Sequence, residues 1–144
     1  MLEIGPGVGY HSAEAIRRIG RLGRLFCLDI QKEMLEEVRR RFSVSAESGA
    51  SFIQGSATHL PLAGGSVDHV FLITVLGEIP DRSAALAEIR RVLRSGGRLS
   101  VSEQLPDPDF ITQRTLRRLL SAAGFIEETT RGFVVYTSTW RVAP

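Results

Sequence analysis

Leu2-Glu3-Ile4-Gly5-Pro6-Gly7-Val8-Gly9-Tyr10 opens the chain with a short apolar run that stops at a glycine loop. The apolar run is typical of the end of a buried strand, and Ile16 and Ile19 follow on one helical face that Gly20 closes. Glycines let the backbone turn sharply and let a ligand approach it without a Cβ in the way. A strand, a glycine loop and a helix in this order predict a ligand site beyond the carboxyl end of the strand.

Apolar runs and helical patterns continue to alternate along the rest of the chain. Strands are expected at residues 25–28, 51–54, 70–75 and 98–102, and helices at 35–42, at 86–93 with a stop at Gly96-Gly97, and after Thr112 as N-cap. Runs at 125–130 and 133–139, joined by Arg131-Gly132, predict a hairpin. Because alternating strands and helices need crossovers, the sequence predicts a single α/β domain over residues 1–144. It is a Rossmann-like, doubly wound, mainly parallel sheet with a C-terminal antiparallel hairpin.

Composition narrows the class of protein. The chain has 144 residues, of which 43% are hydrophobic and 24% charged, with a net charge of +2, a balance that fits one folded domain. The longest aliphatic and aromatic run, at 70–73, is too short to span a bilayer, and Met1 is not followed by the segments of a signal peptide. The single Cys27 can form neither an internal disulfide nor a cysteine-based metal site. We expect a soluble, cytoplasmic domain with no membrane partner and no metal.

The basic residues do not form a surface suited to nucleic acid. All 18 of them except Lys32 are arginines, and nine of these lie in pairs or a triplet beside helically spaced apolar residues, at 17–18, 39–41, 90–91 and 117–118. Such clusters are typical of solvated helix faces. No basic run is interleaved with aromatic residues, so we expect no nucleic-acid partner.

The spacing of the glycine loop separates it from phosphate-binding loops. A dinucleotide fingerprint needs a third glycine or an alanine, whereas the third position is Tyr10 counted from Gly5 and Ser12 counted from Gly7. No Gly-Lys-Ser/Thr follows, which excludes a P-loop. Asp29 ends the second strand, 20 residues past Gly9, where a carboxylate can accept ribose hydroxyls. It can also cap the helix that follows.

Taken together, these features resemble the class I S-adenosylmethionine-dependent methyltransferases, most closely the group of ubiquinone- and menaquinone-biosynthesis methyltransferases. The matching blocks are residues 2–9, 28–30, 55–62, 66–68, 93–99 and 123–125. The resemblance implies seven strands in the order 3-2-1-4-5-7-6. It also implies S-adenosyl-L-methionine (SAM) as cofactor and methyl transfer to a small-molecule acceptor that the sequence does not identify.

The resemblance also implies where the cofactor lies at the ends of the first two strands. Gly5, Gly7 and Gly9 would pass beneath its methionine part, with Glu3 behind the loop. Asp29 would hold the ribose. Because SAM has no phosphate, a loop that gives close backbone approach without a strong anion cradle suits it.

Four further positions follow from the resemblance. Ile30 would pack on the adenine, Ser56 and Ala57 would flank its edge, and Thr74 would lie near the sulfonium. The family commonly has aspartate where Ser56 stands. A serine hydroxyl makes a neutral and therefore weaker hydrogen bond to the adenine amino group.

The chain departs from the family where the acceptor is selected. Family members usually carry a segment before the first strand that closes over the site, whereas here Met1 directly precedes the loop. The chain is then a fragment, a shortened gene product, or a core that takes its lid from another subunit, as in a homo-oligomer. Residues 76–81 carry glycine and glutamate where relatives often place histidine. The acceptors of relatives therefore cannot be transferred to this chain.

No residue is assigned as catalytic. His11 and Glu78 are the candidates for a base near the methyl group, but a helix-start histidine and a loop glutamate are more often solvated. His59 is expected at the surface, and His69 and Cys27 in structural positions. The alternative function is a non-catalytic SAM-binding or interaction module. A nicotinamide-binding domain is a third hypothesis, which the loop spacing disfavours.

Overall fold

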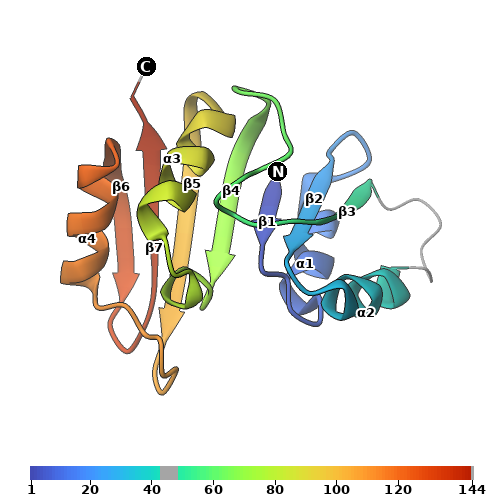
Figure 1. Ribbon diagram of the computed structural model, residues 1–144, viewed down its shortest axis with the longest axis horizontal. Coiled ribbons are helices and arrows are strands. Elements are labelled where there is room, and N and C mark those ends of the chain that lie inside the picture. The colour runs from blue at the N-terminus through green and yellow to red at the C-terminus, as the bar shows by residue number, and fades with distance from the viewer. Residues whose placement is uncertain (43–48, 144) are drawn as a thin grey trace.

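A computed structural model describes residues 1–42 and 49–143. Within them the chain forms seven strands, four α-helices and one 3-10 turn (Figure 1). In chain order these are β1 (Leu2–Ile4), α1 (Tyr10–Ile19), β2 (Leu25–Asp29), α2 (Lys32–Phe42), β3 (Ala50–Gln54), β4 (Val67–Ile73), η1 (Leu76–Glu78), α3 (Arg82–Val92), β5 (Leu93–Gln104), α4 (Gln113–Ala122), β6 (Phe125–Gly132) and β7 (Val135–Val142).

The strands form one sheet in the order β3-β2-β1-β4-β5-β7-β6, as expected. Strands β1 to β5 pair in parallel, and β7 pairs antiparallel with both β5 and β6. The central strand β1 has three residues, all buried, and pairs with β2 on one side and β4 on the other. The parallel strands therefore end together at one edge of the sheet, which is where ligands bind in open α/β folds.

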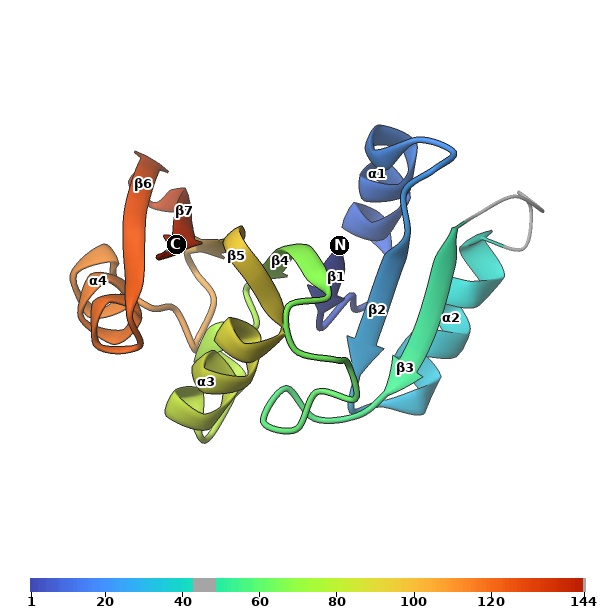
Figure 2. The same cartoon turned by 90° about the horizontal axis from the view of Figure 1, so that it is seen from above.

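Helices cover both faces of the sheet. Figure 2 shows α1 and α2 on one side, next to β2 and β3, and α3 and α4 on the other, next to β5 and β6. Alternate residues of β4 divide between the two cores, since Val70 and Leu72 join the cluster that contains Trp140 and Phe71 packs on the cluster of Cys27. This two-sided burial explains why β4 shows no polar–apolar alternation in the sequence.

The capping residues correctly predict the start of α4 but not the end of α3. Thr112 does cap α4, because its hydroxyl accepts a hydrogen bond from the Thr115 amide. The predicted stop of α3 at Gly96-Gly97 is wrong: the helix ends at Val92 and Leu93 already has extended backbone. Leu93 pairs with Val67 of β4, and the two glycines lie where the β4–β5 register shifts. Burial of Leu93 in the sheet thus ends the helix before the glycines.

Two other boundaries also differ from the prediction. β4 begins at Val67 and ends at Ile73 instead of running over 70–75, because Thr74 turns out of the strand with a φ of +54°. The hairpin turn lies at 133–134, because β6 continues through Arg131 and Gly132 in register with β7. Pairing with a neighbouring strand, which local sequence does not encode, sets these ends.

A carboxyl group is buried at the end of β5. Glu103 is 1% exposed, its Oε2 accepts a hydrogen bond from the Ile111 amide at 3.5 Å, and its Oε1 has no partner among the described residues. The Tyr136 hydroxyl donates to the Ile111 carbonyl, so both side chains hold the segment between β5 and α4. Burial, together with the charges of Asp107 and Glu78, raises the pKa of Glu103 to about 7, although the Ile111 amide and Arg82 lower it.

Replacing Glu103 should change how stability depends on pH. Because the folded-state pKa of about 7 lies above the ordinary 4.5, the native protein loses stability as pH rises from about 4.5 to 7. Glu103→Gln removes this titration. Its free energy of unfolding relative to the native protein should therefore increase by about 2 kcal/mol between pH 5 and pH 8 in urea titrations. Glu36→Gln, an exposed site, is the control, and parallel pH curves for Glu103→Gln and the native protein would contradict the prediction.

Candidate functional site

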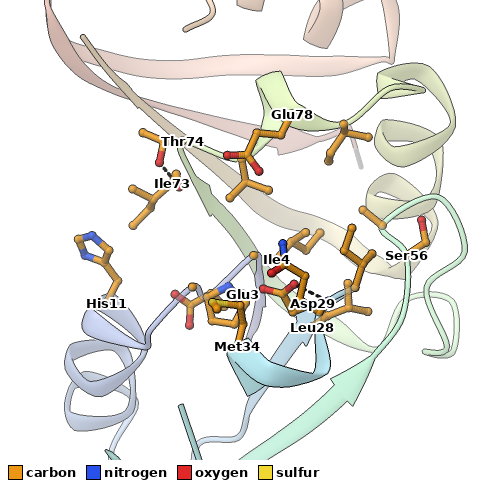
Figure 3. A pocket seen from close by; sticks show the side chains of 18 of the residues that line it. Glu3, Ile4, His11, Leu28, Asp29, Met34, Ser56, Ile73, Thr74 and Glu78 are labelled. Atoms are coloured by element: carbon orange, nitrogen blue, oxygen red, sulfur yellow. Dashed lines mark hydrogen bonds between the residues drawn. The ribbon is translucent and has the colours of Figure 1, made fainter. Parts of the chain in front are cut away.

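A cavity of about 500 Å³ lies at the carboxyl ends of the parallel strands (Figure 3). Its wall comes from the segments that follow β1, β2, β3 and β4, with Gln104 at the end of β5. The volume is within the usual range for small-molecule sites. Eight of the nine expected site residues line it, namely Glu3, Gly5, Gly7, Asp29, Ile30, Ser56, Ala57 and Thr74, and Gly9 does not.

The glycines of the loop have distinct roles. All three have positive φ, but a Cβ on Gly5 would lie 2.5 Å from Val75 Cγ2, and one on Gly9 would lie 3.0 Å from Val38 Cγ1. Gly5 thus permits contact between the loop and the end of β4, and Gly9 permits packing of α1 on α2. A Cβ on Gly7 would meet nothing within 4 Å. Gly7 is therefore the glycine that leaves the backbone open to a ligand.

Asp29 serves the local turn and still lines the cavity. It ends β2, is 9% exposed, and its Oδ1 accepts a hydrogen bond from the Gln31 amide at 2.9 Å. This bond shapes the entry to α2, which starts at Lys32. A carboxylate has further acceptor sites, so it can also accept hydroxyl groups of a ligand. The geometry is therefore compatible with ribose binding, whereas the bond to the Gln31 amide lies before α2 and is a turn rather than a helix cap.

The loop after β3 places the Ser56 hydroxyl on the cavity wall, where this group already makes local hydrogen bonds. Ser56 Oγ lies 2.8 Å from Thr58 Oγ1 and accepts the Thr58 amide at 3.2 Å. Ala57 beside it is buried, and Ile30, which follows the neighbouring strand β2 and also lines the cavity, is 66% exposed. Covering an exposed isoleucine with an apolar ring is favourable because it removes apolar surface from water. The Ser56 hydroxyl already makes hydrogen bonds within its own turn, so less of its capacity remains for a ligand.

Thr74 sits in a strained conformation directly after β4. A φ of +54° is unfavourable for a β-branched residue. The Thr74 amide donates to the Ser102 carbonyl at 2.8 Å, and its hydroxyl donates to the Ile73 carbonyl at 2.8 Å. These bonds hold the strained turn, which places Thr74 and Val75 on the cavity wall. Backbone strain of this kind tends to occur at ligand sites.

Glu3 is a buried acid behind the glycine loop. It is 3% exposed, and burial raises its pKa to about 7, although the Ser12 and Cys27 side chains lower it. The Cys27 thiol lies 3.9 Å from Glu3 Oε2, and burial together with this acid raises the pKa of Cys27 to about 12. Cys27 therefore stays a thiol at neutral pH and is no nucleophile.

The candidate bases separate into two groups. His11 and Glu78 line the cavity. His59 and His69 lie outside the lining, and His69 Nε2 is 2.9 Å from Ser100 Oγ, with its pKa lowered by burial. In Figure 3 Glu78 comes from the side of the cavity that carries Thr74, away from Glu3 and Asp29.

Met34 and Gln104 are among the lining residues that sequence reasoning missed. Met34 lies in the first turn of α2, and its nearness in sequence to Asp29 was an available signal. Gln104 was missed because β5 was expected to end at Ser102, two residues before its actual end.

Known proteins are similar to this chain in sequence. The family model described as "Methyltransferase domain" matches residues 2–101. The ubiquinone/menaquinone biosynthesis C-methyltransferase UbiE of Haemophilus ducreyi is 34% identical over 104 residues, which are 72% of this chain and 40% of that relative. The chain thus spans about two fifths of the length of this curated relative.

Solved structures share the fold. A SAM dependent methyltransferase from Aquifex aeolicus matches with a TM-score of 0.91 and 16% identity, covering 99% of this chain and 81% of that one. The trans-methyltransferase CalH in complex with SAH matches with a TM-score of 0.82 and 21% identity, covering 99% and 51%. At these identities the likeness shows the fold alone.

Alanine substitutions should distinguish the roles of Gly5 and Gly7, the two glycines of the loop after β1 that line the cavity. Gly7→Ala should lower the free energy of unfolding by about 1 kcal/mol, the cost of a Cβ at positive φ, and should place its methyl group in the space open to a ligand. Gly5→Ala should cost roughly 2 kcal/mol more, because its Cβ would overlap Val75. Chemical denaturation measures both. Equal losses of stability would contradict the distinct roles.

Proposed function

Because this chain belongs to the methyltransferase domain family, we propose that it binds SAM and transfers the methyl group to a small-molecule acceptor. One observation carries the proposal: Gly7, open to a ligand, and Asp29, at the end of the adjacent strand, line the same cavity. A cytoplasmic location and a lid supplied by a second copy of the chain are further parts of the proposal.

The residues present fit this cofactor. Gly7 leaves room for a ligand against the loop backbone, the exposed Ile30 offers an apolar surface for the adenine, and Asp29 retains acceptor sites for the ribose hydroxyls. SAM carries a positive sulfonium, which suits a wall that holds the carboxyl groups of Glu3, Asp29 and Glu78. Gly9 supports the loop through its packing on Val38 rather than through direct contact.

The chemistry asks little of the protein beyond positioning. When bound, SAM supplies an electrophilic methyl group that an aligned nucleophile can attack. The side chains near Thr74 and Val75 would hold the methyl end in place, and such alignment supplies most of what this transfer needs. A base is required only where the acceptor atom carries a proton of high pKa, so neither His11 nor Glu78 is assigned as catalytic.

Binding and transfer assays test the proposal and its alternative. Calorimetry with S-adenosylhomocysteine (SAH) should show saturable binding, and labelled SAM with fractionated small-molecule extracts should yield a labelled product. Absence of heat at millimolar SAH would overturn the proposal. Binding without transfer to any fraction would favour a non-catalytic SAM-binding module.

Asp29→Asn should weaken SAH binding roughly tenfold, about 1.4 kcal/mol, because the amide replaces a charged acceptor of the ribose hydroxyls. The asparagine oxygen can still accept the Gln31 amide, so the turn is retained. Calorimetry measures the affinity. Asp68→Asn, which removes an exposed carboxylate paired with Arg94, is the control and should leave the affinity unchanged. Equal affinities of the Asp29 variant and the native protein would remove Asp29 from the site.

Ser56→Asp should strengthen SAH binding, by roughly threefold to tenfold. A carboxylate at this position can accept the Thr58 amide, as the serine does, and also accept the adenine amino group with a charge-assisted bond. Calorimetry with adenosine as a second ligand shows whether the gain lies in the adenosine part. A loss of affinity for both ligands would mean that residue 56 does not face the adenine.

A further inference from the structure

The cavity wall has an unbalanced charge. Of the described residues that line it, Glu3, Asp29 and Glu78 carry carboxyl groups, and none is Lys or Arg. His11 is the one basic side-chain type among them. A cavity of this composition has a negative potential, and low-dielectric walls concentrate such a field.

Glu78 is the carboxylate of this wall with the least compensation. Partial burial raises its pKa, and the charged groups that act on it, Asp107, Asp109 and Asp29, raise it further because all three are negative. By contrast, Asp29 holds the Gln31 amide, and Glu3 is buried beside Cys27. Among residues 1–42 and 49–143 no cation forms an ion pair with Glu78.

Arg82, the cationic residue closest to Glu78 in sequence, makes its hydrogen bonds to the backbone instead. Arg82 Nε donates to the Leu76 carbonyl at 3.1 Å and its Nη2 to the Gly77 carbonyl at 2.5 Å. These bonds fix the guanidinium on the backbone of η1. They also fix η1 itself, which is further held by close packing of Gly77 on the Asp109 carbonyl. Glu78, the last residue of η1, is therefore presented to the cavity from a braced segment.

We propose that Glu78 is the charge-selecting residue of this site and favours the positively charged methyl donor SAM over its neutral product SAH. The inference rests on the proposed function. SAM and SAH share the adenosine, the ammonium and the carboxylate, and they differ by one methyl group and its positive charge. A nearby carboxylate attracts only the donor through this difference. Because Glu78 is exposed, water screens the attraction and limits it to a modest factor.

This selection has a consequence for turnover. Transfer of the methyl group removes the positive charge from the bound cofactor. Glu78 then loses a favourable partner and again faces only carboxylates. The contribution of Glu78 to binding is therefore smaller for the product than for the donor, which favours exchange of the product for a new donor molecule.

Calorimetry with SAM and SAH on the native protein, Glu78→Gln and Glu36→Gln tests the inference. Glu78→Gln keeps the size of the side chain and removes its charge. The preference for SAM, measured as Kd of SAH divided by Kd of SAM, should fall roughly threefold to tenfold in this variant. Glu36→Gln removes the same charge from an exposed position on α2 outside the cavity lining and should leave the preference unchanged.

The outcomes separate the inference from the proposed function. If the native protein binds neither ligand, the proposed function fails, and the inference with it. If it binds both and Glu78→Gln has the native preference, only the inference is overturned. An equal fall in Glu78→Gln and Glu36→Gln would also overturn it, because the effect would then come from net charge and not from Glu78. Glu78→Asp, which keeps the charge, should retain most of the preference.

Discussion

Gly5 has to be a glycine because the central strand ends where there is no room for a side chain. The strand β1 has only three residues and is paired on both sides, so the chain must leave the sheet within one step. The Gly5 amide donates to the Leu28 carbonyl at 2.8 Å, and its Cα faces Val75 so closely that a Cβ would overlap it. This contact joins the ends of β2 and β4 to the loop after β1. The cavity exists because these three segments meet there.

The other parts of the cavity wall are also places where regular structure is broken. Asp29 turns the chain by accepting the Gln31 amide, Ser56 does the same for Thr58, and Thr74 is held at positive φ by two hydrogen bonds. Each turn satisfies its backbone groups locally, which a wall without regular pairing requires. The turns therefore keep their shape without a ligand, and the arrangement is preformed.

Local sequence was sufficient for the alternation of strands and helices and for the final hairpin, because these follow from where apolar runs stop. The order of the strands and most of the wall were predicted from the family resemblance. It was insufficient where a distant partner sets the boundary. The glycines at 96–97 are typical of a helix end, but Leu93 is already drawn into the sheet by Val67. Gln104 was missed for the same reason, because β5 continues to this residue through its pairing with β7. Gly9 belongs to the loop motif, yet the position of Val38 gives it a packing role that no spacing rule contains.

The acidic side chains at this end of the sheet differ in how deeply they are buried. Glu3 lies deepest, and with a pKa of about 7 it is only partly ionised at neutral pH. Glu103, equally buried at the end of β5, behaves alike. Asp29 and Glu78 lie at the ends of their segments, where both line the cavity and Glu78 is exposed. A carboxylate at the exposed position of Glu78 attracts a cation where the cation can still exchange with water, which suits the proposed methyl donor, a ligand that arrives charged and leaves neutral.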